Sequence, residues 1–396
     1  MDSEGEVVLG FFANSHFIWT MDLKKTLWAI IAVLVVINLG LVIFFESAAK
    51  APAAGEAVTE EMEQQRQQFG RLSFWKQLIG NGPGDPQYAW QNSRYDGLRI
   101  DGDQQEAVIS VMIDNFSLAR PQHEGIRRAS IVYEVLVEGG ITRLMLLFPY
   151  QDIDRVGPIR SARDYFVDLA EEYGGIHIHA GGSPMALEQL ASSQRLYQLD
   201  EDDRDGGESY SWRDTRYAAP HNLFLDVNAV RDFAADHSWR LEPSRQAFCF
   251  TDEALDGPEA TQVELDFSHD RSSSSFVFFQ YQDDQQVYQR YYGASQHTPH
   301  LDQGDGMQVA PVNVVVQIAP SRLISGDEKE RLALQHIGQG KAFFFRGGKV
   351  LEGRWSKSAE DQPTVFRDLT GGEVCLSTGQ SWIALLDGEE LLSFQE

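Results

Sequence analysis

Hydrophobic and polar positions divide the chain into an apolar run, a polar stretch and a long region of short apolar segments. The apolar run is Leu27–Phe45, which has 19 residues and no charged side chain. At about 1.5 Å per residue, a helix of this length spans the hydrocarbon layer of a bilayer. Soluble helices are rarely apolar on every face over such a length. The run therefore predicts a single transmembrane helix.

Two lysines determine the expected orientation of this helix. Lys24 and Lys25 lie directly before it, and basic residues stay on the cytoplasmic side of a membrane. We therefore expect segment 1–26 in the cytoplasm, although its first 20 residues would be absent if translation started at Met21. A cleaved signal peptide is the alternative, because residues 47–49 are small, but its apolar region is usually shorter than this run.

Residues 46–95 have the composition of a linker. Ala, Pro and Glu dominate its first part, and the turn-forming sequence NGPGDP occupies 81–86. We expect this segment to hold the globular part of the protein away from the membrane.

Residues 96–239 alternate between strand-like and helix-like patterns, which predicts an α/β or α+β domain. Gly139-Gly140 reads as a two-residue hairpin turn. The expected strands are 107–115, 130–138, 141–148 and 175–180, and the expected helices are 165–173 and one that begins at Pro184.

After a connector at 240–261 the pattern becomes strand-dominated. Residues 262–396 are expected to form a second, mainly β domain, because short β-prone runs alternate there with Gly, Asp and Ser turns. The expected strands are 276–281, 287–292, 309–318, 342–345, 350–355, 373–376 and 381–386.

Composition narrows the classes of function. The chain has 33 basic and 59 acidic residues, a net charge of −26, so nucleic acid is not an expected partner. Its two cysteines, Cys249 and Cys375, are too few for a thiolate zinc module. They could form one disulfide in an oxidising compartment, but the sequence does not place them near each other. No cofactor or metal is expected.

Several blocks of sequence resemble the YerB-like lipoprotein family. They are ARPQ at 119–122, IVYEVLVEGGITR at 131–143, GPIRSARDYFVDLA at 157–170, HAGGSP at 179–184, PHN at 220–222, PHLD at 299–302, NVVVQ at 313–317, GRWSKS at 353–358, TVF at 364–366 and GQSWI at 379–383. The resemblance covers roughly 96–396 and implies an extracytoplasmic bacterial protein with no assigned reaction. Such proteins usually carry a lipidated cysteine, which is absent near residue 49, so the helix at 27–45 would replace the lipid.

Arginines accumulate in one of these regions. Seven Arg and five carboxylates lie between residues 120 and 163 of a strongly acidic chain. Guanidinium groups suit carboxylate or phosphate, and a helix N-terminus also favours an anion. An anion site is one interpretation, and internal salt bridging is the other. The candidate ligand-binding residues here are Arg120, Arg143, Arg160, Ser161 and Arg163.

The predicted hairpin adds a possible acid/base pair. A two-residue loop at 139–140 would place Glu134 and Glu138 on one face with Arg143, because strand side chains alternate. Two carboxylates on one face can perform glycoside hydrolysis. A satisfied charge network is the more common use of such an arrangement.

A second set of candidates follows the predicted strand 175–180. His177 and His179 would share one face, a spacing that suits a metal, but no third ligand is evident. The helix beginning at Pro184 would offer free N–H groups to an anion. We therefore add His179, Gly181, Gly182 and Ser183 as ligand-binding candidates. The resemblance alone adds His221 and Asn222.

In the second region, His300 and Asp302 lie in a segment of metal-like spacing that begins at His297. Only these two residues fall within the family motif, and a structured turn between strands is the more common reason for such residues. They are kept as candidates of the C-terminal domain.

Two functional hypotheses follow from the sequence. The first is a membrane-anchored, extracytoplasmic binding or scaffold protein of the bacterial envelope with an Arg- and His-lined anion site. Its partners would be the membrane, peptidoglycan, an anionic envelope polymer or an envelope protein. The second is a cell-wall hydrolase that uses Glu134 or Glu138 as acid or base, assisted by His179. Whether the protein is an enzyme stays open.

Overall fold

The computed structural model describes residues 90–101, 108–202, 210–241, 244–269, 275–293 and 297–395. All of them belong to one compact unit that begins at Pro86. Segment 1–26, the predicted transmembrane helix 27–45 and the linker up to residue 89 lie outside the described residues. Within the described part, none of the helices is long and apolar enough to cross a membrane. The linker prediction extends too far, because residues 90–95 belong to the folded unit.

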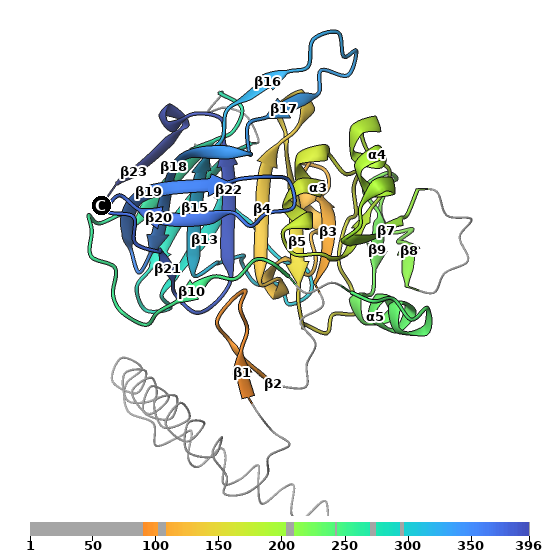
Figure 1. The fold of residues 1–396 in the computed structure, drawn as a ribbon, viewed down its shortest axis with the longest axis horizontal. Helices are drawn as coiled ribbons and strands as arrows, with labels where there is room; N and C mark the ends of the chain where they lie inside the picture. The colour runs from red at the N-terminus through yellow and green to blue at the C-terminus, as the bar shows by residue number, and fades with distance from the viewer. Residues whose placement is uncertain are drawn as a thin grey trace, which may run out of the picture. The chain divides into compact units, whose positions relative to one another are not determined.

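A mixed sheet of ten strands forms the centre of this unit (Figure 1). Its order is β20-β19-β18-β15-β22-β4-β5-β3-β6-β7. The strands in chain order are β3 (Ile109–Asp114), β4 (Ile131–Leu136), β5 (Thr142–Phe148), β6 (Gly175–His179), β7 (Leu196–Asp200), β15 (Asn313–Ile318), β18 (Gly338–Arg346), β19 (Lys349–Lys357), β20 (Val365–Asp368) and β22 (Ser381–Leu386). The two regions that the sequence analysis separated thus contribute five strands each to one sheet.

Three α-helices among the described residues cover the two faces of this sheet. They are α3 (Asp164–Glu171), α4 (Pro184–Ser192) and α5 (Val227–Asp236). Phe166 of α3 and Leu190 of α4 pack in the same core as Val135. Val230 of α5 packs in the other core with Val132, on the opposite face. Ser183 caps the N-terminus of α4, because its hydroxyl accepts a hydrogen bond from the Ala186 amide in the first turn of the helix.

A second sheet of five strands lies on the α5 side. Its order is β14-β13-β12-β11-β23. Val277 and Phe279 of this sheet share a core with Val314 and Val316 of β15. The unit is therefore mostly β with few helices. The strands are β11 (Gln262–Asp266), β12 (Phe276–Gln282), β13 (Val287–Tyr292), β14 (Thr298–Pro299) and β23 (Leu392–Gln395).

Four two-stranded pairs complete the described strands: β1 (Trp90–Asn92) with β2 (Arg99–Asp101), β8 (Ser211–Arg213) with β9 (Leu223–Leu225), β10 (Cys249–Phe250) with β21 (Cys375–Leu376), and β16 (Ser321–Leu323) with β17 (Leu332–Leu334). A disulfide joins Cys249 to Cys375, whose Cα atoms are 4.4 Å apart. It answers the question of pairing that the sequence left open.

The hairpin between β4 and β5 differs from its prediction. The Val137 amide donates to the Ile141 carbonyl, which closes a loop of three residues, Glu138–Gly140. Gly139 and Gly140 both have positive φ, at 74° and 67°, a conformation that glycine adopts without strain. The expected two-residue turn was therefore wrong.

This difference shifts the register of the hairpin by one residue. Arg143 pairs with Val135, whereas Glu134 pairs with Leu144. Because side chains alternate along a strand, Glu134 and Arg143 lie on opposite faces of the sheet. The predicted shared face of these two groups was wrong.

Candidate functional site

The candidate site lies at one edge of the large sheet, where β3 ends. Strands β3, β6 and β7 are parallel, so their carboxyl ends meet at the same edge. Two loops run side by side there, residues 157–163 before α3 and residues 180–183 before α4. The Ala162 amide donates to the Gly181 carbonyl, and the Ser183 amide donates to the Ala162 carbonyl.

Asp114, the last residue of β3, organises this edge. Its Oδ2 accepts a hydrogen bond from His221 Nδ1 at 2.6 Å and forms an ion pair with Arg160, whose Nε lies 2.9 Å away. Its Oδ1 accepts from the Phe116 amide at 3.0 Å. Burial raises the pKa of the Asp114 carboxyl, but the bonds from Phe116 and His221 and the charge of Arg160 outweigh it and hold the pKa below its usual value.

Arg143 faces the same side of the sheet, because it is the cross-strand partner of Asp114. Its side chain is buried, with 6% of the residue exposed. One terminal nitrogen donates to the Ser161 carbonyl at 2.7 Å, while Nε has no hydrogen-bond partner. No carboxylate among the described residues forms an ion pair with this guanidinium. Burial first, and then the neighbouring Arg163, lower the pKa of Arg143 to about 10.

Arg163 and Glu138 form an ion pair next to Arg143. Burial raises the pKa of Glu138, but the hydrogen bond and charge of Arg163 outweigh it, and the pKa is lowered. Glu138 is therefore ionised and is already paired with Arg163. Among the described residues, Arg160 and Arg163 form ion pairs with Asp114 and Glu138, whereas Arg143 forms none. The cluster keeps one positive charge, and a buried charge without a counter-ion costs several kcal/mol, on the order of 3–5.

The loop before α4 does not present the free amides that the sequence analysis expected. The Gly181 amide donates to Asp200 Oδ1 at 2.7 Å, and Ser183 caps its own helix. Gly181 has a positive φ of 65°, and a Cβ there would lie 2.9 Å from Asp202 Oδ2. A Cβ at Gly182 would lie 3.0 Å from Leu187 Cδ2. This loop supports the Arg160–Arg163 segment and offers no evident anion cradle.

The two histidines of β6 share one face as predicted, with ring centroids 5.7 Å apart. His179 is fully buried, and its two ring nitrogens lie 3.0 Å from the Gly181 carbonyl and 3.3 Å from Gln198 Oε1. His177 bonds to the Ser110 hydroxyl. In the described residues, no group of three His, Cys, Asp or Glu side chains could hold a metal ion. Both histidines have the contacts of core residues.

Asn222 and Arg120 have structural contacts of their own. The Asn222 amide donates to the carbonyls of Asp214 and Tyr217 and shapes the loop that carries His221. Arg120 donates to the Asn115 carbonyl and lies 3.8 Å from the centre of the Tyr292 ring. The structure thus places neither side chain beside Arg143.

Glu134 lies at the centre of a fully buried polar network on the other face of the sheet. Both of its oxygens accept from Arg290, at 2.8 and 2.9 Å, and Oε2 also accepts from the Trp382 indole. Asn115 and Thr142 donate to Oε1. With 0% exposure and every donor in place, Glu134 has the environment of a structural ion pair. It is not close to Glu138 in the manner that acid/base catalysis needs.

This network reaches Asp114 through two histidines. Arg290 bonds to His300 Nδ1 at 2.7 Å, His300 Nε2 bonds to His123 Nδ1 at 2.8 Å, and His123 Nε2 bonds to the Asp114 carbonyl at 2.6 Å. A guanidinium only donates and a carbonyl only accepts, so each imidazole is neutral. His300 therefore donates its Nε2–H to His123 Nδ1, and His123 donates its Nε2–H to the Asp114 carbonyl. Burial lowers the pKa of His123 to about 3, and the pKa of His300 is lowered well below its usual value.

The last candidate, Asp302, binds backbone amides. Its carboxylate accepts from Gly125, Arg127 and Gly304 and is 2% exposed. Asp302 therefore stabilises a structured turn and joins the two halves of the chain. A structured turn was the alternative to a metal site in the sequence. His300 shares this structural role through the network above.

Of the predicted residues, Arg143, Arg160, Ser161 and His221 come together around Asp114. Asp114 was not predicted, although its position as an acidic residue near the end of the expected strand 107–115 was a usable signal. Arg290 and His123 were not predicted either, because Arg290 lies 156 residues from Glu134 and His123 lies 177 residues from His300. No local pattern indicates those contacts.

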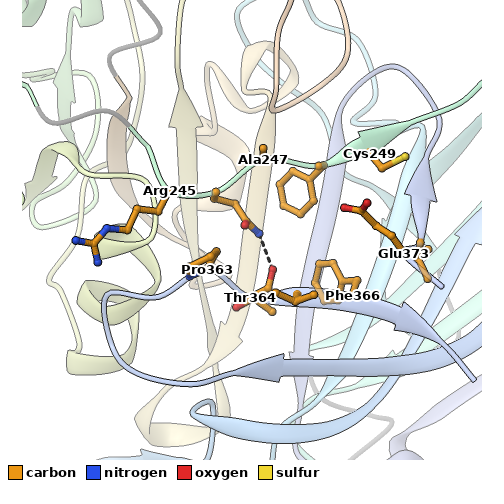
Figure 2. A pocket seen from close by; sticks show the side chains of 11 residues that line it. Arg245, Ala247, Cys249, Pro363, Thr364, Phe366 and Glu373 are labelled. Atoms are coloured by element: carbon orange, nitrogen blue, oxygen red, sulfur yellow. Dashed lines mark hydrogen bonds between the residues drawn. The ribbon is translucent and has the colours of Figure 1, made fainter. Parts of the chain in front are cut away.

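The chain also has a small pocket of about 160 Å³ that is lined in part by the connector 240–261 (Figure 2). It lies between residues 245–249 and residues 363–366 and 373–374. Gln246 donates to the Thr364 carbonyl across it, and Arg245 pairs with Asp361. None of the candidate residues lines it, and its one other charged side chain is the acidic Glu373.

Comparisons with known proteins agree with this architecture. Residues 96–240 match the N-terminal domain model of a "Protein of unknown function (DUF3048)", and residues 263–383 match its C-terminal domain model. The chain is 30% identical over 279 residues to "Putative lipoprotein YerB" of Bacillus subtilis, which covers 70% of this chain and 80% of that protein. The crystal structure of YerB superimposes with a TM-score of 0.67 at 26% identity, over 77% of this chain and all of that one.

Proposed function

This chain belongs to the DUF3048 family, and on that basis we propose that it is a membrane-anchored, extracytoplasmic protein of the bacterial cell envelope that binds an anionic ligand beside Arg143 and Arg160. The observation that carries the ligand class is the cluster of three arginines beside Asp114, in which the buried Arg143 guanidinium has an Nε without a hydrogen-bond partner and no carboxylate partner in the described part of the chain.

The location rests on three independent features. Leu27–Phe45 is long and apolar enough to span a bilayer, and Lys24 and Lys25 orient it. The relative from Bacillus subtilis is named as a lipoprotein. A disulfide such as Cys249–Cys375 persists in oxidising compartments and is rare in the cytosol.

Protease accessibility tests this topology. Protease added to intact spheroplasts should digest the region after residue 86 and spare a cytoplasmic control protein. A protected C-terminal region would contradict the orientation. A mature protein that starts near Lys50 would show instead that the apolar run is a cleaved signal peptide.

Arg143 should be essential for anion binding. In the full-length protein, Arg143→Gln should weaken the binding of soluble peptidoglycan fragments with free carboxylates, or of an anionic envelope polymer, by at least about tenfold, because a hydrogen bond to a charged group is worth about 1.5–3 kcal/mol. The measurement is a calorimetric titration.

Arg346→Gln is the matched control for that variant. Arg346 is also mostly buried and also donates to a carbonyl, that of Glu253, but it does not belong to the Asp114 cluster. Equal binding by the parent and by Arg143→Gln would remove the proposed site. A scaffold role without a ligand would then be the remaining form of the hypothesis, tested by co-purification from membranes.

A further inference from the structure

His221 is the part of the cluster that can change its charge. It precedes β9, and the Phe116 ring stacks on it with centroids 5.7 Å apart. Asp114 is ionised and can only accept, so His221 Nδ1 carries the hydrogen of their 2.6 Å bond. Nε2 is then the nitrogen that gains or loses a proton, and no described residue hydrogen-bonds to it. The side chain is 13% exposed, so solvent and a ligand can reach it.

The charged groups around His221 come from several elements. Asp114 contacts it from the end of β3, and Arg160 meets the same Asp114 oxygen from the loop before α3. From its own loop, Asp214 is already paired with Arg155 and Arg216.

Two acidic residues at and just after the end of β7 also have partners of their own. Asp200 accepts from the Gly181 amide and lies 3.7 Å from His179, and Asp202 pairs with Arg213. Arg143 faces Asp114 across the β3–β5 pair. With His221 neutral, the cluster has one surplus positive charge, and protonation at Nε2 makes it two.

We propose that the anion site is built for a doubly charged oxyanion of the sulfate or phosphate-monoester type, and that binding is coupled to uptake of one proton by Nε2 of His221. The inference rests on the proposed anion site and adds its ligand charge and its regulation. Asp114 acts as the positioning residue, because it holds both His221 and Arg160 by the same oxygen. A singly charged carboxylate already balances the cluster and gains less from the added proton.

Sulfate is the probe that isolates the protein's contribution, because it stays doubly charged across the range used. For the full-length protein, the affinity for sulfate should rise about tenfold as the pH falls from about 8 to about 5.5, whereas acetate should show a smaller rise. Titrations in two cationic buffers that differ in ionisation enthalpy should show uptake of up to one proton per sulfate bound.

His221→Gln is the informative variant. A glutamine amide can still donate to Asp114 but carries no charge, so sulfate binding should persist with an affinity that no longer depends on pH. If this variant does not fold, the His221 Cε1–H resonance of the parent protein gives the same information, since sulfate should move its titration to higher pH.

The outcomes separate the two proposals. Sulfate binding whose affinity is the same at both pH values, or a His221 titration that sulfate does not move, would overturn the proton coupling and leave the anion site intact. Acetate binding more tightly than sulfate at low pH would overturn the choice of a doubly charged ligand. Absence of binding by either anion at any pH would contradict the anion site itself.

Discussion

Two buried charges on neighbouring strands have opposite roles. Both oxygens of Glu134 accept hydrogen bonds, and the donors come from both halves of the chain. Arg143 is nearly as buried, yet its guanidinium lacks an acidic partner among the described residues. Because buried charges are normally paired, the difference between these residues separates the structural centre of the molecule from its candidate site.

The buried histidines make stability depend on pH. His123 has a pKa of about 3 in the folded protein, compared with about 6.5 in an unfolded chain. The unfolded state therefore binds more protons, so the stabilisation is complete above about pH 6.5 and is lost as the pH falls towards about 3. The free energy of unfolding should fall by about 1.4 kcal/mol per pH unit for each such imidazole.

Urea denaturation between about pH 6.5 and pH 5 measures this effect, since most carboxylates titrate lower. A His123→Gln variant should start from a lower stability and show a shallower slope. A parent protein with the same stability at both ends of this interval would contradict the assignment of neutral imidazoles to the chain from Arg290 to Asp114.

The sequence could identify part of this site and not the rest. Arg143, Arg160 and His221 belong to motifs that carry a family resemblance, and the local excess of Arg indicated an anion. The contact between Arg290 and Glu134 joins residues 156 positions apart, so no spacing rule could reveal it. The sequence also does not show how exposed a side chain is, which is why Glu134 and His179 were candidates although both are fully buried.

At the level of elements, the hairpin between β4 and β5 shows why the register could not be predicted. All residues of β5 and nearly all of β4 are buried on both faces, so no polar and apolar alternation distinguishes one face from the other. The register then depends on the loop, and three residues with two glycines at positive φ form it instead of two. By contrast, strong segments such as β12, β13 and β22 were located within a residue of their ends, because their apolar runs end in clear turn signals.

At the scale of the molecule, one sheet joins the two family domains. β22 lies between β15 and β4 and is parallel to both, so its residues hydrogen-bond to each half of the chain. The large core likewise includes Val132 from one half and Phe279 from the other. The sequence pattern changes near residue 240, but such a change does not indicate which strands pair.

Fragments cut between the two regions should therefore not fold independently. Residues 86–261 alone would leave the backbone of β4 unpaired at a newly exposed edge, and residues 262–396 alone would leave β22 in the same state. Circular dichroism and urea titration should show no cooperative transition for either fragment, whereas residues 86–396 should unfold cooperatively. Independent cooperative unfolding of either fragment would contradict this interdependence.

The central position of β22 also has a consequence for biosynthesis. Trp382 of β22 and Glu134 of β4 are separated by 248 residues and meet in the finished sheet. While the chain is being made, β4 has no neighbour on that side until residue 386 has emerged. Contacts between residues so distant in the chain form slowly, and unpaired strand edges invite aggregation. The edge of β4 therefore stays unpaired for most of synthesis, and a factor that covers strand edges during this interval should raise the yield of folded protein.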